Sequence, residues 1–167
     1  MGEDQLTGLT PAPSPAGEGI RLQQWDAGCQ PAITLMAEEG ASLSSGSLRL
    51  YASLITHHSS LIVGCIDLYS YDPLNRRCAV GIMVSSEHRR QGHALAMLHA
   101  LENLYSTQTI KQSSNQTIHT LYADIAATNA ASLALFAKAG YTECGHFRDW
   151  LLVGDRYIDS IRMQLIL

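Results

Sequence analysis

The sequence is poor in features that mark several classes of protein. Its 167 residues contain no apolar run approaching the roughly 18 residues that are needed to span a bilayer. The first residues show no apolar core of the kind found in signal peptides. The 4 cysteines are scattered and show no C-x-x-C spacing. We therefore expect a cytoplasmic protein without a membrane partner, in which the cysteines are buried free thiols.

Positive charge is also scarce. Lys and Arg number 11 against 15 Asp and Glu, which gives a formal net charge of −4. Because binding to nucleic acid depends on a basic surface, we expect no nucleic-acid partner. A mildly acidic surface instead favours a cationic substrate such as an amine. The one adjacent histidine pair is His57 and His58, and we expect no metal site.

The amino-terminal residues differ in composition from the rest of the chain. Residues 1–19 contain Pro11, Pro13 and Pro15 among Gly, Ala and Ser, and this composition predicts a flexible arm. From residue 20 onward, apolar segments recur without an internal repeat. A chain of this length suits one domain with a full-sized core, so residues 20–167 are predicted to form a single domain.

Hydrophobic periodicity gives the expected order of elements. Helices are predicted at 31–39, 94–105 and 130–139. Strands are predicted at 20–25, 48–55, 61–71, 78–84, from 121 onward, at 149–153 and at 157–167. Turns are predicted at 56–60, 72–75 and 154–155.

One stretch carries most of the functional information. The apolar strand 78–84 enters a basic turn, which then opens the helix 94–105. The first N–H groups of a helix lack internal partners and carry the positive end of its dipole. Gly92 leaves room for a ligand, while Arg89 and Arg90 add positive charge. This stretch predicts a site for an anion such as a pyrophosphate.

The order Arg89-x-x-Gly92-x-Ala94 resembles the acetyl-coenzyme A (acetyl-CoA) signature of the GNAT superfamily of N-acetyltransferases. A second block resembles the other half of that superfamily's cofactor site. It has the pattern Asn-x-x-Ser-x-x-Leu-aromatic-x-Lys-x-Gly-aromatic and runs from Asn129 to Tyr141. Two half-sites in the right order are more specific than either one alone.

The resemblance implies the fold. It indicates an α/β (α+β) protein whose central, mixed, mostly antiparallel twisted sheet has about 6–7 strands flanked by helices. Two splayed strands, ending near Val84 and Asn129, would hold the cofactor. The superfamily usually places two helices between its first and second strands, where this chain has only the segment 26–47. The lid over the acceptor pocket is therefore either truncated or missing residues.

The resemblance also implies acetyl-CoA as co-substrate, bound by both motifs and by the end of the strand 78–84. The expected cofactor-binding residues are Ile82, Met83, Val84, Arg89, Arg90, Gln91, Gly92, His93, Ala94, Asn129, Ser132, Phe136 and Lys138. Within this set, the Asn129 side chain would bond the pantetheine arm. A backbone N–H at Met83 or Val84 would stabilise the oxyanion.

The expected chemistry needs a base, because amines are protonated at neutral pH. The position of Asp124 matches the base of ribosomal-protein N-acetyltransferases, and Asp67 is the alternative. In many members a tyrosine protonates the leaving thiolate, but this chain has Phe136 at that position. Tyr122, Tyr141 or water could take over this role.

The segments 66–68, 72–77 and 154–159 bring the chain closest to polyamine and ribosomal-protein N-acetyltransferases. We expect transfer of acetyl to a primary amine, on a polyamine-like small molecule or a protein N-terminus. The alternative is a catalytically weak acyl-CoA-binding module of the same fold. The tail strand could also pair across a homodimer.

Overall fold

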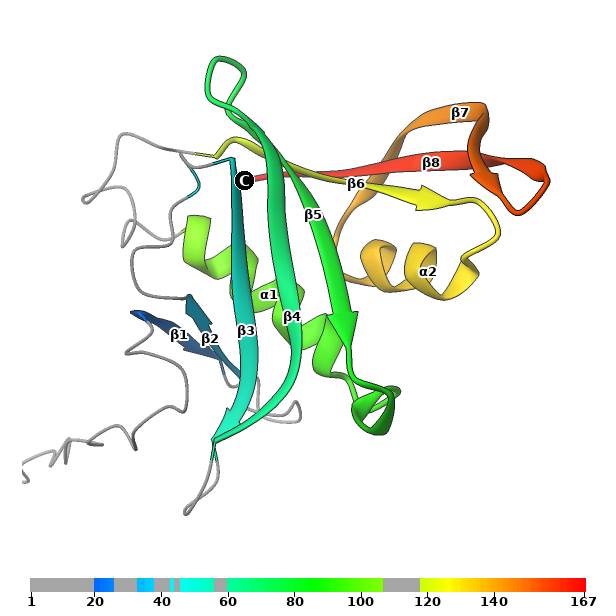
Figure 1. Ribbon diagram of the computed structural model, residues 1–167. Helices are drawn as coiled ribbons and strands as arrows, with labels where there is room; N and C mark the ends of the chain where they lie inside the picture. The colour runs from blue at the N-terminus through cyan, green and yellow to red at the C-terminus, as the bar shows by residue number, and fades with distance from the viewer. Residues whose placement is uncertain (1–19, 26–32, 38–42, 44–45, 56–59, 107–117) are drawn as a thin grey trace, which may run out of the picture.

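The computed structural model describes residues 20–25, 33–37, 43, 46–55, 60–106 and 118–167. The predicted arm at 1–19 and His57 and His58 lie outside them. The described residues form one 8-stranded sheet with two α-helices (Figure 1). The strands are β1 (Ile20–Trp25), β2 (Ile33–Ala37), β3 (Ser47–Ile55), β4 (Ser60–Asp72), β5 (Arg77–Val84), β6 (Thr120–Ala126), β7 (Thr142–Val153) and β8 (Arg156–Ile166). The helices are the 3₁₀ turn η2 (Ser86–His88), α1 (His93–Ser106) and α2 (Ala130–Lys138).

The strands lie in the order β1-β2-β3-β4-β5-β6-β8-β7. Neighbouring strands are antiparallel except for β5 and β6, which run parallel. Helix α1 lies between β5 and β6 in the chain, as a parallel connection requires. The expected mixed, mostly antiparallel sheet is confirmed.

Helix α1 covers one face of the sheet and packs against β1, β2, β4 and β5 (Figure 1). Leu95, Leu98, Leu101 and Leu104 recur at helical spacing, and each is at most 7% exposed. Ile66 of β4 belongs to the same hydrophobic core. Burial of each such side chain contributes about 1.5–3 kcal/mol, so this layer fixes α1 on the sheet.

The opposite face of the sheet is polar. Ile66 is buried in β4, whereas Asp67 is half-buried and Tyr69 is exposed. Successive side chains of a strand point to opposite faces, so Asp67 and Tyr69 share one face. The strand register carries this face across the sheet. We call it the polar face and define it by Arg49, Asp67, Tyr69, Gly81, Tyr122, Asp124 and Arg162.

The parallel strands β5 and β6 part before either of them ends. Their register covers three pairs, of which Ala79 and Tyr122 are the last. Beyond that pair, β5 continues to Val84 and β6 continues to Ala126. Figure 1 shows the two strands diverging toward their carboxyl ends. The predicted splay is therefore present.

The prediction of a helix over 31–39 is wrong, because Ile33–Ala37 forms strand β2. This strand pairs with β1 on one side and β3 on the other. Ile33 and Leu35 are 0% exposed, and Thr34, which points to the other face, is 1% exposed. A strand buried on both faces reads as a continuous apolar run, which periodicity cannot distinguish from a short helix.

The tail forms a hairpin of β7 and β8 around the predicted turn, where Gly154 has a φ of 60°. β7 begins at Thr142, earlier than the expected start at residue 149. Cys65 and Cys78 are buried free thiols, as expected, but Cys144 on β7 is exposed. The reason is that β7 is the edge strand and covers little of the core.

Candidate active site

The predicted strand-turn-helix around Gly92 is present. β5 ends at Val84, and the C=O of Gly92 accepts the first bond of α1 from the Ala96 N–H at 3.0 Å. The N–H groups of His93 and Ala94 therefore stand at the positive end of the helix dipole, ahead of the first intrahelical donor. Gly92 has a φ of 85°, a left-handed conformation that glycine adopts without strain.

A pocket of ≈ 300 Å³ lies between this turn, the start of α1 and helix α2. Arg89 and Arg90 line it from the turn, and Lys138 lines it from the last turn of α2. A helix N-terminus surrounded by cations is a suitable site for phosphate groups. The predicted residues that meet in this pocket are Val84, Arg89, Arg90, Gly92, His93, Ala94 and Lys138.

The side chains of Gln91 and His93 brace the turn. Gln91 Nε2 donates to the Glu87 C=O at 3.0 Å, and Gln91 Oε1 lies 3.3 Å from His93 Nε2. The His93 ring is 4% exposed, and its Nδ1 has no hydrogen-bond partner among the described residues. Burial lowers the pKa of His93 and the charge of His88 lowers it further, so this ring is neutral at pH 7.

Two hydrogen bonds fix the direction of the backbone groups of β5. The Ser85 N–H donates to the Val63 C=O of β4 at 2.9 Å. The Thr120 N–H of β6 donates to the Arg76 C=O at 3.1 Å. Backbone hydrogen-bonding groups alternate between the two sides of a strand. Odd-numbered residues of β5 therefore face β4, and even-numbered residues face β6.

By this alternation, Ile82 and Val84 direct their N–H and C=O groups into the gap beside β6, whereas Met83 faces β4. The Val84 C=O accepts a bond from Arg89 Nε at 3.1 Å, which ties the basic turn to the strand. An extended ligand rich in amides could pair with the other groups as an added strand. Of the two expected oxyanion donors, the alternation favours Val84.

The second motif opens and stabilises α2. Asn129 Oδ1 accepts from the Ser132 N–H at 3.1 Å, so Asn129 is the N-cap of the helix and its amide group stays a donor. Phe136 is 3% exposed and packs edge-on against Tyr141, with ring centroids 4.9 Å apart. Asn129, Ser132 and Phe136 do not line the pocket beside α1.

Both candidate bases lie on the polar face, and each is held by an arginine. Asp67 accepts from Arg49 Nε at 2.6 Å and from Arg49 Nη2 at 2.9 Å. Asp124 accepts from Arg162 Nε and Nη2, both at 2.7 Å. The hydrogen bond to Asp124 raises the pKa of Arg162. Both oxygens of each carboxylate thus accept a hydrogen bond from its arginine, which fixes the orientation of the carboxylate on the polar face.

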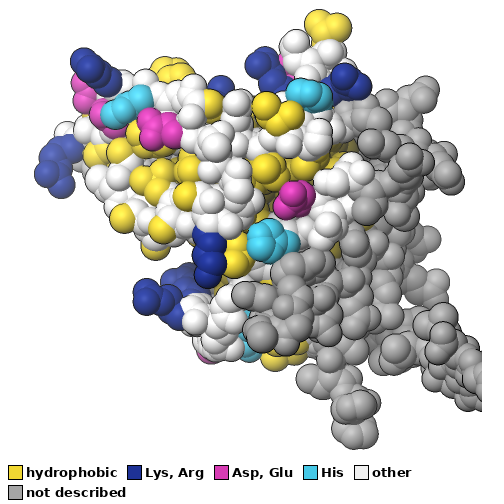
Figure 2. All heavy atoms as spheres, turned by 180° about the vertical axis from the view of Figure 1, so that it is seen from behind, with side chains coloured by type: hydrophobic (Ala, Val, Ile, Leu, Met, Phe, Trp, Pro, Cys, Tyr) yellow, Lys and Arg dark blue, Asp and Glu magenta, His cyan; other side chains and the backbone are white. Residues whose placement is uncertain are grey.

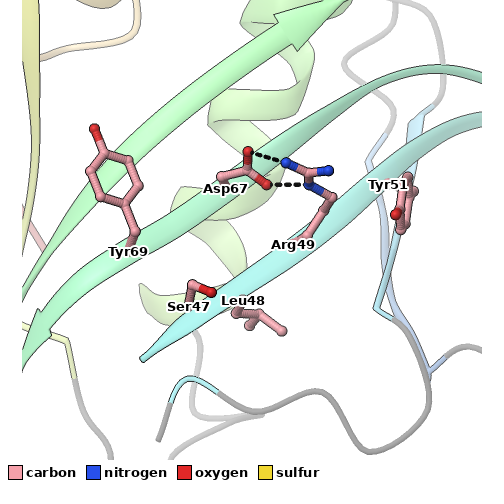
Figure 3. A pocket seen from close by; sticks show the side chains of 6 residues that line it. All are labelled: Ser47, Leu48, Arg49, Tyr51, Asp67 and Tyr69. Carbon is pink, nitrogen blue, oxygen red and sulfur yellow. Dashed lines mark hydrogen bonds and ion pairs between the residues drawn. The ribbon is translucent and has the colours of Figure 1, made fainter. Parts of the chain in front are cut away.

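Sequence reasoning missed these arginines. Arg162 lies 38 residues from Asp124 in the chain, so no local pattern connects them. It also missed Tyr69, which lines a second pocket of ≈ 440 Å³ around the Arg49–Asp67 pair (Figure 3). Strand alternation could have found Tyr69, because it lies two residues after Asp67 on the same face.

The two expected substitutes for a tyrosine acid lie in different places. The Tyr141 hydroxyl is buried without a hydrogen-bond partner among the described residues, and burial raises its pKa. Tyr122 is on the polar face, where the Arg162 guanidinium lies 4.6 Å from its ring centroid. Tyr141 is thus a core residue, and Tyr122 serves as a platform for Arg162.

Within the part of the chain that the structure describes, no three His, Cys, Asp or Glu side chains are grouped to hold a metal ion. No helix within the same residues is long and apolar enough to cross a membrane.

Solved structures with the same fold include spermidine N-acetyltransferase from Vibrio cholerae. Its crystal structure in complex with CoA and spermine gives a TM-score of 0.62 at 20% identity, over 74% of this chain and 67% of that chain. A dodecameric structure of the enzyme in an intermediate state gives a TM-score of 0.60 at 20% identity, over 72% of this chain and 65% of that chain. At such identity the likeness shows the fold alone.

Sequence comparison gives the family. The chain is 24% identical, over 106 residues, to a spermidine N(1)-acetyltransferase of Vibrio cholerae serotype O1. This match covers 63% of this chain and only 57% of that relative. The model of the acetyltransferase (GNAT) domain family matches residues 22–142, which is more than half of the chain. The chain therefore belongs to the GNAT acetyltransferase domain family.

Proposed function

We propose that this chain transfers an acetyl group from acetyl-CoA to a primary amine. The observation that carries this proposal is the divergence of β5 and β6 directly beside a cationic helix N-terminus. A diphosphate and an extended amide-rich arm, the two recognisable parts of CoA, need these two features side by side.

Each part of the donor has a matching group. The N–H groups of His93 and Ala94, with Arg89, Arg90 and Lys138, suit the diphosphate. The backbone edge of β5 at Ile82 and Val84 suits the pantetheine amides, and the Asn129 amide group suits one of their carbonyls. Gly92 keeps the space beside the diphosphate free of a side chain.

The acceptor would approach from the polar face, which carries both candidate bases. A protonated amine must lose a proton before it can attack, and Asp124, through a water molecule, is the proposed base. The Val84 N–H is the proposed donor to the oxyanion that forms on the thioester carbonyl. Asp67 remains the alternative base.

For the acceptor we propose a polyamine-like amine, because the sequence relative is a spermidine N(1)-acetyltransferase. The net charge of −4 supports a cationic substrate. Because the buried free thiols Cys65 and Cys78 suit a reducing compartment, we propose a cytoplasmic location.

Self-association is a further part of the proposal, because a solved relative is dodecameric. Figure 2, from behind, shows hydrophobic side chains exposed on the half of the molecule that carries α2, β7 and β8. On the β7–β8 hairpin, Trp150, Leu152, Val153 and Tyr157 are each at least 58% exposed. Such a surface favours burial between copies. Sedimentation analysis would give the oligomeric state.

The test is release of free thiol from acetyl-CoA with spermidine, spermine and a peptide with a free N-terminus as acceptors. Turnover with a polyamine and retained CoA binding would support the proposal. Tight CoA binding without turnover on any acceptor would favour the acyl-CoA-binding module. Absence of CoA binding would contradict both.

A further inference from the structure

If the proposed transfer takes place, the leaving thiolate needs a proton. The two tyrosines expected to supply it, Tyr122 and Tyr141, have other roles in the structure. Phe136 has no hydroxyl, and it is packed in the core against Tyr141. The Tyr141 hydroxyl is itself enclosed in the core. Tyr122 supports the Arg162 guanidinium on its ring face. Another hydroxyl group on the polar face could then supply the proton.

Tyr69 of β4 has such a hydroxyl. It pairs in register with Ala79, but its ring leans along β5 toward Gly81. A Cβ atom added to Gly81 would lie 3.5 Å from Tyr69 Cε1, so the ring rests on the bare backbone of Gly81. Figure 3 shows the ring of Tyr69 on the opposite side of Asp67 from Tyr51. The side chain therefore reaches from β4 over β5.

Gly81, which the Tyr69 ring contacts, lies where β5 and β6 begin to separate. Ala79 and Tyr122 form the last pair of β5 and β6, and the next residues on the polar face are Gly81 and Asp124. Tyr69 thus stands over the apex of the gap between the two strands, on the face that also carries Asp124.

The electrostatic surroundings of the phenol agree with this placement. Burial raises the pKa of Tyr69, and the charge of Asp124 raises it further, followed by Tyr122. Cys78 and Asp67 raise it as well, so the phenol lies among groups of β4, β5 and β6. A phenol is protonated at neutral pH, as a proton donor requires.

We propose that Tyr69 is a catalytic residue that donates its phenolic proton to the sulfur of CoA as acetyl leaves. This inference rests on the proposed function. The amine nitrogen forms a bond to the acetyl carbon, and the C–S bond breaks with its electron pair going to sulfur. The Tyr69 proton then moves to sulfur. Before the attack, the protonated amine gives one proton to the solvent through Asp124 or water. The second proton, lost by the nitrogen as the amide forms, restores the phenol. The net products are the acetylated amine, the free thiol and one proton released to the solvent.

The experiment compares Tyr69→Phe with Tyr51→Phe. Both substitutions remove one hydroxyl and keep the ring, and Tyr51 lies on the neighbouring strand β3 along the same pocket. The whole 167-residue chain is assayed by thiol release with acetyl-CoA and spermidine. CoA affinity is measured by calorimetry, and thermal melting shows whether each variant is folded.

We expect kcat of Tyr69→Phe to fall by about 100-fold. The KM for spermidine and the Kd for CoA should stay within about twofold of wild type, and Tyr51→Phe should keep the wild-type kcat. A wild-type kcat in Tyr69→Phe overturns the inference, and so does a rise in the spermidine KM at unchanged kcat. If the wild-type protein binds CoA but transfers no acetyl, the proposed function itself fails, and this inference fails with it.

Discussion

The two sides of the gap between β5 and β6 are built by different means. On the side of α1, the site consists mainly of backbone groups, which a glycine turn and a helix start present to a ligand. On the polar face, the site consists of side chains held in pairs across strands, such as Asp124 with Arg162. The backbone side is built mainly by residues that are close together in the chain. The polar face depends on pairs of residues distant in the chain.

The largest effect is expected on the backbone side. Gly92→Glu brings a side chain and a negative charge to the place proposed for the diphosphate. We expect the Kd for CoA to rise by more than about 100-fold, because juxtaposed like charges cost several kcal/mol. Titration calorimetry measures this.

Gly154→Glu is the matched control, because Gly154 also has positive φ but lies in the β7–β8 turn. Both variants should lose about 1–2 kcal/mol of stability from backbone strain. Only Gly92→Glu should lose affinity for CoA. Equal CoA affinity in the two variants would argue against the proposed diphosphate site.

On the polar face, Asp124→Asn removes the proposed base and leaves the backbone side intact. We expect kcat to fall by about 100-fold at neutral pH, with an unchanged Kd for CoA. Asp72→Asn is the control, since Asp72 is also paired with an arginine, Arg77, but lies at the end of β4. If Asp124→Asn turns over like wild type, the role of base passes to Asp67.

A smaller effect is expected for the cations around the pocket. Lys138→Ala should raise the Kd for CoA by about 3- to 5-fold, because an exposed ion pair contributes about 1 kcal/mol or less. The difference should shrink in high salt. Arg156→Ala, at the exposed start of β8, should leave the affinity unchanged. A salt-independent loss would mean that Lys138 acts through packing of α2.

The smallest effect concerns pH. Burial depresses the pKa of His93 in the folded state, so protons bind preferentially to the unfolded chain. The contribution of His93 to the free energy of unfolding should therefore be fully present above its pKa in the unfolded chain, about 6.5. This contribution should decline as the pH falls below that value. Denaturant unfolding from pH 7 to pH 5 should show a shallower decline for His93→Gln. A decline in His93→Gln as steep as that of wild type would contradict this prediction.

The difference between features built by neighbouring residues and features built by distant residues also determines what the sequence could predict. The turn around Gly92 and the helix that follows Asn129 were predictable, because each feature lies within a few neighbouring residues. The divergence of β5 and β6 followed from the resemblance to the superfamily. Strand β2 was misread, because burial of both faces removes the alternation that identifies a strand.

The pairing of the aspartates with arginines was not predictable from local sequence. It depends on the register of β6 with β8 and of β3 with β4, which places Asp124 opposite Arg162 and Asp67 opposite Arg49. That register depends on how the hydrophobic patterns of two strands and the turn geometry fit together, so a few neighbouring residues do not reveal it. The reach of Tyr69 over Gly81 likewise depends on the register of β4 with β5.

Residue-resolved amide hydrogen exchange by NMR, with and without acetyl-CoA, tests the central claim most directly. The account predicts that acetyl-CoA slows exchange at Ile82, Val84, His93 and Ala94, whose N–H groups face the gap or open the helix. Exchange at Met83, which faces β4, should change little. Unchanged exchange at those four amides when acetyl-CoA is bound would contradict the account.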